Sequence, residues 1–255
     1  HYIKSEKYKG EIHFSTGSNT ARSSSNFYAL NNGIATLFEI RGVGIGKTSF
    51  KRRINSGLAV GFSFLKTAYE NSNFIFNQID IANTYTNDIV LQHERSIYTD
   101  VIKAIDIESN ELIDFSTTMH SSKDSYAISK RDRPLAYIIK KNNYGFIEKL
   151  NDVGVNYVEL EKDTMIYSGG YKVVEFNNKF KVYEKMKMQK VVTSIEYSNN
   201  KFSKGDILIS MNQKRSNLIA ELLEPEAPNS YVSFGIIKTS LNNQLPIYRI
   251  KNFNN

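Results

Sequence analysis

The sequence contains no cysteine and only four histidines among its 255 residues. Disulfides and thiolate metal sites are therefore excluded, which leaves histidine, aspartate and glutamate as the strong metal ligands. No apolar run reaches the roughly 18 residues that a membrane-spanning helix needs, so no membrane span is expected. The sequence also lacks the basic-then-apolar start of a signal peptide.

Basic residues exceed acidic ones by seven, with 33 Lys and Arg against 26 Asp and Glu. The positive charges are scattered along the chain, so no nucleic-acid partner is expected. Apolar residues make up 40% and charged residues 23% of the chain, which is typical of a globular protein. Because the first residue is His1, the chain is expected to be a processed product or a segment of a longer protein.

An apolar segment and a helical pattern dominate the first third of the chain. Residues 34–40 read Ile-Ala-Thr-Leu-Phe-Glu-Ile, which predicts a strand that is buried on both faces. From residue 49 to residue 71 the apolar side chains recur every three or four positions, which predicts a helix. Thr48 or Ser49 could cap its start. A strand at 10–15 and a polar loop at 16–26 are expected before it.

The rest of the chain has the pattern of a mixed α/β region that is rich in strands. Strands are expected at residues 89–93, 101–107, 112–117, 134–141, 157–160, 191–197 and 206–211, with two more within 166–183 around Asn177-Asn178. Helices are expected at 145–153 and 213–223, and residues 231–250 are expected to be loop with short extended pieces. A boundary is expected at 77–86. The predicted fold is α/β, with one unit at 1–80 and a mixed, β-rich α/β accessory domain at 86–255.

Residues 41–48 read Arg-Gly-Val-Gly-Ile-Gly-Lys-Thr, in the strand-to-helix context of a phosphate-binding loop. The pattern G-x-x-x-x-G-K-[ST] requires glycine at position 41, and counting from Gly42 leaves the loop one residue short. Backbone N–H groups must surround the phosphate, so a missing residue weakens the match. Nucleotide binding by residues 42–48 stays an alternative to a simple flexible connection.

Glu39 is a carboxylate within the apolar segment. A buried ionised carboxylate is costly unless it is paired, hydrogen-bonded or close to a metal. Arg41 would share its strand face and would lower the pKa of Glu39. The spacing fits a simple ion pair, a strand end open to water, or a functional carboxylate.

Residues 31–42, Asn-Asn-Gly-Ile-Ala-Thr-Leu-Phe-Glu-Ile-Arg-Gly, resemble the strand of zinc carboxypeptidases that carries their catalytic glutamate. Residues 42–54 resemble the glycine loop and helix that follow it in bacterial members. Residues 133–139, 222–235 and 245–250 are similar to C-terminal segments of a bacterial branch of the family. These similarities follow one another in the same order across nearly the whole chain.

The resemblance implies the C-terminal part of a zinc carboxypeptidase, an enzyme that hydrolyses C-terminal bonds of peptide or peptidoglycan substrates with zinc as cofactor. Glu39 matches the general base of that family. Substrate contacts would come from Arg22, Arg41 and Tyr28. The family uses a tyrosine on a mobile loop before the glutamate strand, and Tyr28 is the nearest candidate, although it does not clearly match that tyrosine. A cation at Arg22 would favour an acidic terminal residue, although a solvated loop arginine is the favoured interpretation.

The His-x-x-Glu zinc-ligand pair of the family is absent from the sequence. The four histidines are His1, His13, His93 and His120, and none has Glu three residues later. His93-Glu94 begins like H-E-x-x-H, but position 97 is Ile. The zinc ligands are therefore expected upstream of His1, in another segment of the same protein. The protein is expected to be secreted or periplasmic. A catalytically inactive, peptidase-derived binding module is the alternative.

Two patterns in the accessory region are interpreted as structural. Glu224 and Glu226 flank Pro225, which predicts the end of a helix. Residues 179–190 alternate lysine with apolar residues, which predicts a half-exposed strand. A nucleic-acid surface would instead need clustered arginines and aromatic platforms.

Overall fold

The computed structural model describes residues 2–3, 13–17, 20–40, 46–84, 87–141 and 144–252. The helices are α2 (Ser24–Leu30), the 3-10 helix η1 (Gly46–Ser49), α3 (Phe50–Glu70), α4 (Ser72–Asn83), α5 (Tyr144–Asp152) and α6 (Ser216–Leu223). The strands are β1 (Tyr2–Ile3), β2 (His13–Thr16), β3 (Ile89–Asp106), β4 (Leu112–Arg131), β5 (Ala136–Ile139), β6 (Val158–Glu159), β7 (Thr164–Tyr183), β8 (Met186–Phe202), β9 (Ile207–Ser210) and β10 (Gln244–Ile250). The chain is thus a mixed α/β, strand-rich structure, as the sequence predicts, whereas its division into two domains stays a prediction.

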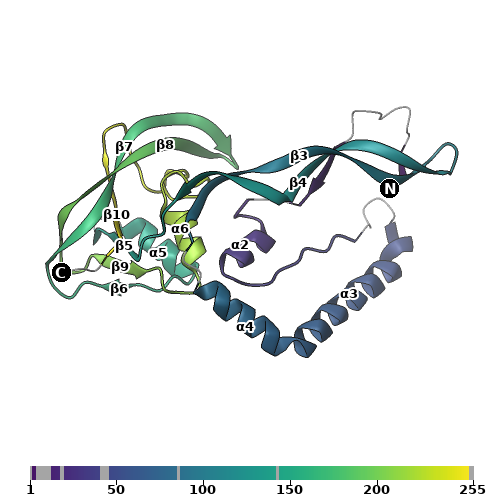
Figure 1. Cartoon of the computed structure of the whole chain (residues 1–255), viewed down its shortest axis with the longest axis horizontal. Helices are drawn as coiled ribbons and strands as arrows, with labels where there is room; N and C mark the ends of the chain where they lie inside the picture. Colours follow the sequence, from purple (N-terminus) through teal and green to yellow (C-terminus); the bar gives the residue numbers. More distant parts are fainter. Residues whose placement is uncertain are drawn as a thin grey trace.

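A six-stranded antiparallel sheet organises the C-terminal half, in the order β6-β9-β5-β10-β7-β8 (Figure 1). One of the short extended pieces expected within residues 231–250 is the strand β10, which lies inside this sheet with Ile247 opposite Ile139. β10 contains Pro246, and it is held by neighbours about 80 and 110 residues away in sequence, which no local pattern reveals.

The main hydrophobic core lies between the six-stranded sheet and the helices α5 and α6. It includes the fully buried side chains Tyr137, Ile139, Leu150, Ile207, Ile219 and Leu223. The helices predicted at 145–153 and 213–223 are confirmed, since α5 and α6 each have an apolar face for this core.

β3 and β4 form a long antiparallel ribbon that extends away from the sheet (Figure 1). The structure joins the predicted strands 89–93 and 101–107 into β3, which has register shifts between Val90 and Ser96. The turn predicted at Ser109-Asn110 is confirmed, and Asn110 has a positive φ of 58°. The short strands β1 and β2 pair in parallel with the outer edges of the ribbon.

β7 and β8 form a second hairpin, and its turn differs from the prediction. Two strands separated at Asn177-Asn178 were expected, but β7 continues through these residues with an irregularity between Asn177 and Lys181. The chain reverses at Glu184 and Lys185, whose φ angles of 45° and 68° are both positive. Positive φ at both central residues is the geometry of a type I′ hairpin turn.

α3 and α4 project away from the sheet, and residues 31–40 pass between them and the ribbon (Figure 1). The helix predicted at 49–71 is confirmed by α3, although no side-chain hydrogen bond caps its start. α4 and α2 were not predicted; α2 begins within the expected polar loop at 16–26. No residue of α3 or α4 is buried, and no helix of the described residues is long and apolar enough to cross a membrane.

Candidate functional site

The segment that carries Glu39 is extended but is not a strand. Residues 33–40 have no regular secondary structure, and Leu37 and Phe38 are 66% and 52% exposed. The prediction of a strand buried on both faces is therefore wrong for this chain. No strand of the described residues pairs with the segment, so neither a hydrogen-bond ladder nor a covering layer protects its side chains.

Glu39 itself is exposed, which corrects the expectation of a buried carboxylate. Among the described residues it forms no ion pair within 4.0 Å. Arg41 lies outside the described residues, so both its substrate role and its pairing with Glu39 stay predictions. The carboxylate of Glu39 is thus accessible to solvent.

Two apolar grooves, of about 730 and 600 Å³, lie between the Glu39 segment and α3. The first groove is lined by Ile34, Phe38, Ala59, Val60, Ser63, Phe64, Thr67, Ala68 and Ile75, and the second by Tyr28, Ile34, Ala35, Thr36, Phe38, Ile40, Gly57, Val60, Gly61, Phe64 and Leu65. Tyr28, which is 58% exposed, therefore borders the same groove as the segment of Glu39.

Arg22 lies elsewhere, against the β7–β8 hairpin. Its guanidinium carbon is 3.5 Å from the centroid of the Tyr183 ring and 5.1 Å from that of Phe234. A guanidinium that stacks on an aromatic face is held in place by the ring quadrupole. The structure thus brings Tyr28, but not Arg22, to the groove lined by Phe38 and Ile40, the neighbours of Glu39 in sequence; Glu39 itself is not among the lining residues, and the substrate roles of Tyr28 and Arg22 stay predictions.

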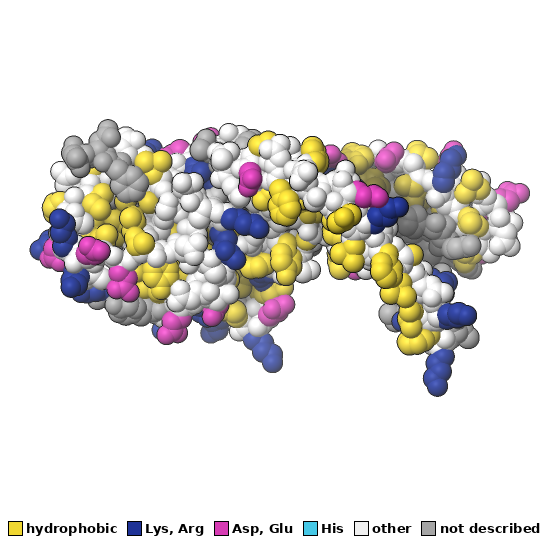
Figure 2. Space-filling model, turned by 90° about the horizontal axis from the view of Figure 1, so that it is seen from below, with side chains coloured by type: hydrophobic (Ala, Val, Ile, Leu, Met, Phe, Trp, Pro, Cys, Tyr) yellow, Lys and Arg dark blue, Asp and Glu magenta, His cyan; other side chains and the backbone are white. Residues whose placement is uncertain are grey.

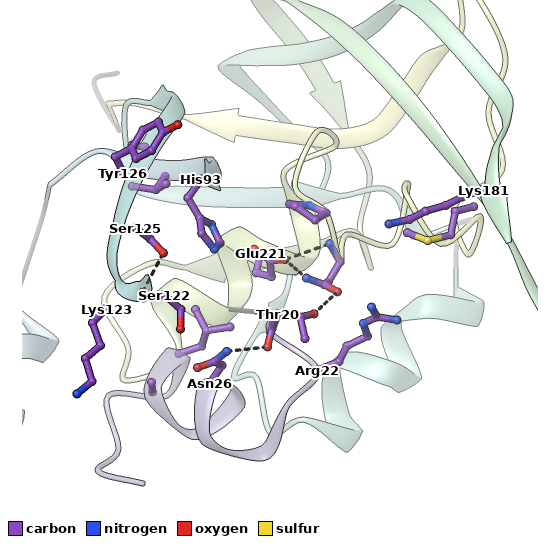
Figure 3. Close-up of a pocket in the computed structure, with 18 residues that line it drawn as sticks. Thr20, Arg22, Asn26, His93, Ser122, Lys123, Ser125, Tyr126, Lys181 and Glu221 are labelled. Atoms are coloured by element: carbon purple, nitrogen blue, oxygen red, sulfur yellow. Dashed lines mark hydrogen bonds between the residues drawn. The ribbon is translucent and has the colours of Figure 1, made fainter. Parts of the chain in front are cut away.

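A cavity of about 800 Å³, lined by both polar and apolar side chains, opens beside Arg22, between residues 20–30 and the elements β3, β4 and α6 (Figure 3). Glu221 of α6 lines it and accepts hydrogen bonds from the backbone N and the Nδ2 of Asn229, at 3.1 and 2.7 Å. Thr20 Oγ1 donates to Asn229 Oδ1 at 3.4 Å. Burial raises the pKa of the Glu221 carboxyl, and the bonds from Asn229 oppose that shift. No sequence motif indicates this cavity, because its residues come from distant segments.

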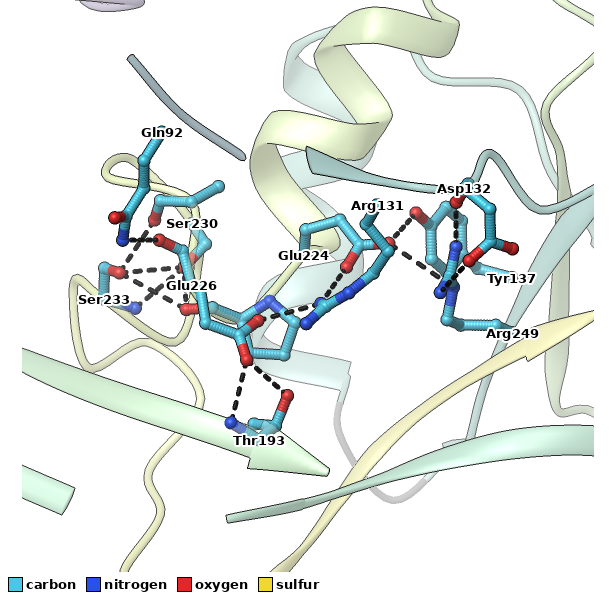
Figure 4. Close-up of polar contacts among 12 residues, drawn as sticks. Gln92, Arg131, Asp132, Tyr137, Thr193, Glu224, Glu226, Ser230, Ser233 and Arg249 are labelled. Atoms are coloured by element: carbon cyan, nitrogen blue, oxygen red, sulfur yellow. Dashed lines mark hydrogen bonds and ion pairs between the residues drawn. The ribbon is translucent and has the colours of Figure 1, made fainter. Parts of the chain in front are cut away.

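A buried charge network lies at the base of the β3–β4 ribbon (Figure 4). Arg131 Nη1 donates to Glu224 Oε2 at 2.6 Å and to Glu226 Oε2 at 2.9 Å. Glu224 also accepts from the hydroxyl of Tyr137 at 2.5 Å, and Arg249 Nε lies 3.5 Å from it. Glu226 Oε1 accepts from both the backbone N and the hydroxyl of Thr193, at 2.8 and 2.6 Å.

This network is structural rather than catalytic. Burial and the neighbouring Glu224 carboxylate raise the pKa of Tyr137 well above 10. Burial alone would lower the pKa of Arg131, but its bonds to Glu226 and the charge of Glu224 raise it, so it stays charged. α6 ends at Leu223, which confirms the helix stop predicted at Pro225. The paired carboxylates are thus engaged by arginines of the same chain.

Within the ranges that the structure describes, no group of three His, Asp or Glu side chains could hold a metal ion. His93 and His120 are both in the β3–β4 ribbon, where their neighbours across the hairpin are Ala127 and Ile97. The residues at hand therefore do not fit a zinc site. Residues 41–45 of the glycine loop are outside the described residues, so the nucleotide alternative stays a prediction.

Comparison with known proteins finds similarity to fungal carboxypeptidases. The chain is 30% identical to Carboxypeptidase 2 of Trichophyton equinum over 235 residues. This aligned stretch covers 89% of this chain and 43% of that protein. It is 27% identical over 253 residues to Carboxypeptidase 2 of Trichophyton tonsurans, covering 98% of this chain and 47% of that protein. The corresponding protein of Trichophyton rubrum is 29% identical over 235 residues.

These similarities support a relationship to carboxypeptidases, which the sequence motifs indicate, but not to their bacterial branch. The chain spans less than half the length of these curated relatives. No protein-family model matches the sequence, and no solved structure matches it.

Proposed function

We propose that the chain is part of a metallocarboxypeptidase that hydrolyses C-terminal peptide bonds, with Glu39 as the general base. The observation that carries this proposal is the similarity to proteins named Carboxypeptidase 2 over 98% of the chain. A single motif such as residues 31–42 would carry much less weight than similarity over this length.

The uncovered apolar surface around Glu39 supports the same proposal. Protein interiors are close-packed, and apolar grooves of 730 and 600 Å³ beside exposed aromatic side chains are not a finished core. We infer that further polypeptide, homologous to the other half of the relatives, fills these grooves and covers Glu39. That polypeptide would also carry the zinc ligands, which the described residues do not supply.

In this arrangement the role of Glu39 is proton transfer. Its carboxylate would take a proton from the attacking water and pass it to the nitrogen of the leaving amine, so that the peptide bond breaks without releasing an unstable anion. An exposed carboxylate with no ion-pair partner among the described residues is free to reach such a water once the site is covered.

The proposal is tested by replacing Glu39 with glutamine in the longest natural polypeptide that contains this chain, assayed on an N-blocked dipeptide with and without a metal chelator. Glu39→Gln keeps the size of the side chain but cannot accept the proton, so kcat should fall by about 10²–10⁴-fold. Glu70→Gln on α3 is the control, because Glu70 is exposed and its ion pair within the described part of the chain is with exposed Lys66, at 3.8 Å.

Three results separate the possibilities. Turnover in Glu39→Gln equal to that of the parent would overturn the role of Glu39 as base. Activity that a chelator does not reduce would overturn the metal dependence. A parent protein that binds peptides but hydrolyses none would favour the inactive binding module.

A further inference from the structure

The cavity beside Arg22 is built by two parts of the chain that are far apart in sequence. One wall comes from residues 20–30, and the others come from β3, β4, the β7–β8 hairpin, α6 and the loop that carries Asn229 (Figure 3). Its volume of about 800 Å³ lies within the 300–1,000 Å³ that is typical of sites for small ligands. The accessory region therefore shapes a ligand-sized space next to the segment that resembles a peptidase.

Two cations share one side of this cavity. Lys181 precedes Tyr183 by two residues in β7, so their side chains lie on the same face of the strand. Arg22 stacks on the ring of Tyr183, with 3.5 Å between guanidinium carbon and ring centroid. Figure 3 shows the ammonium end of Lys181 pointing toward the side on which Glu221 lies.

These two cations have no ion-pair partner within 4.0 Å among the described residues, although Glu184 hydrogen-bonds Tyr183, the ring on which Arg22 stacks. Neither Arg22 nor Lys181 forms an ion pair with a described carboxylate, and Tyr183 holds Arg22 without contributing a formal negative charge at neutral pH. Glu221 is the sole carboxylate among the described lining residues, and it is already engaged by two bonds from Asn229.

We propose that this cavity binds a carboxylate group of an acidic peptide, with Arg22 and Lys181 as its cationic partners. Charge-assisted hydrogen bonds from two cations at one side of a half-enclosed space are the common way in which proteins hold carboxylates. The peptide nature of the ligand rests on the proposed function, whereas the preference for a carboxylate rests on the cavity alone. The accessory region would thereby select acidic substrates.

The proposal is tested by calorimetric titration of the 255-residue chain with four N-acetylated tripeptides. Ala-Glu-Ala and Ala-Gln-Ala, each with a free or an amidated C-terminus, separate a side-chain carboxylate from a terminal one. A preference of about tenfold or more for the carboxylate-bearing peptide of either pair is expected, and it identifies which carboxylate binds. Equal binding of all four peptides, or no binding, overturns the proposal.

Two lysine variants of the same hairpin show whether the cavity is responsible. Lys181→Gln should lower the preference for a carboxylate by about fivefold or more, because it removes one of the two cations. Lys187→Gln is the matched control, since Lys187 is exposed and lies opposite Val182, on the other face of the hairpin. Equal losses in both variants would show general surface attraction and would overturn the site.

This titration is independent of hydrolysis. If the carboxylate preference is found but the longer protein cleaves no peptide, the proposed function fails and the site stands. If cleavage occurs but the four peptides bind alike, the site fails and the proposed function stands.

Discussion

Arg131 shows how much of this protein depends on single long-range contacts. Its guanidinium joins Glu224, 93 residues away, and Glu226, 95 residues away. The Glu-Pro-Glu sequence predicts a helix stop from local chemistry alone, and α6 does end there. The arginine partner could not be predicted, because nothing near Glu224 in the sequence points to position 131.

Replacing Arg131 with methionine should destabilise the protein by about 3–5 kcal/mol. The change removes the cation that fully buried Glu224 shares with Glu226. Glu224 keeps Arg249, at 3.5 Å, but Glu226 is left without an ion-pair partner among the described residues, and an uncompensated buried charge is costly. Chemical denaturation followed by circular dichroism measures the change in unfolding free energy.

Lys103→Met is the control for this prediction, because Lys103 pairs with Asp114 on the surface and both side chains are more than half exposed. It should cost no more than about 1 kcal/mol. An Arg131→Met variant as stable as Lys103→Met would show that the network does not hold the ribbon to the sheet.

At Glu39 the sequence indicates an unusual residue but not how exposed that residue is. The sequence indicates Glu39 as unusual because a carboxylate interrupts an apolar segment, and this choice still stands as a proposal. Its predicted burial is wrong in this structure, because burial depends on what covers residues 34–40 and not on their own hydrophobicity.

Among the elements, helices with a local period were predicted better than strands with distant partners. α3, α5 and α6 follow from apolar spacing of three and four residues. β10 and the continuous β7 do not, because their pairing is set by β5 and β8, and the Asn177-Asn178 pair looks like a turn in isolation. The cavity beside Arg22 depends on the same distant packing.

The turn of the β7–β8 hairpin should be improved by Glu184→Asn together with Lys185→Gly. Both positions have positive φ angles, which Asn and Gly adopt at much lower cost than Glu and Lys. The double variant should be more stable by about 1 kcal/mol, measured by denaturant unfolding.

Asn178→Gly tests the alternative turn position directly. Asn178 lies inside β7, so Asn178→Gly should destabilise the protein. Glycine adds backbone freedom to the unfolded chain and contributes no side-chain packing to the strand. A gain in stability from Asn178→Gly, with none from the Glu184-Lys185 variant, would place the reversal where the sequence pattern alone predicts it.

The whole molecule combines a well-packed sheet with an uncovered helical arm. Exposed apolar side chains on α3 and α4 include Phe50, Ile54, Leu58, Phe62, Phe64, Leu65, Tyr69, Phe74, Phe76 and Ile81. Figure 2 shows hydrophobic side chains in a row along the projecting part of the molecule. Soluble monomers seldom expose so much contiguous apolar surface, so this face is expected to be covered by other polypeptide in the working protein.

The 255-residue chain by itself should therefore self-associate and bind a hydrophobic dye, and substitutions on α3 should reduce both effects. Phe62→Glu with Leu65→Glu introduces two charges on residues that are 68% and 66% exposed, and glutamate keeps a good helix propensity. The midpoint of sheet unfolding should stay unchanged, because these two side chains do not belong to any buried core cluster.

Analytical ultracentrifugation over a range of concentrations, with dye fluorescence, measures the effect, and Lys66→Gln on the same helix is the control. A parent chain that stays monomeric and does not increase the fluorescence of the dye would show that the apolar face of α3 and α4 is stable in water without a covering polypeptide. That result would remove the support that this face gives to the proposed carboxypeptidase site.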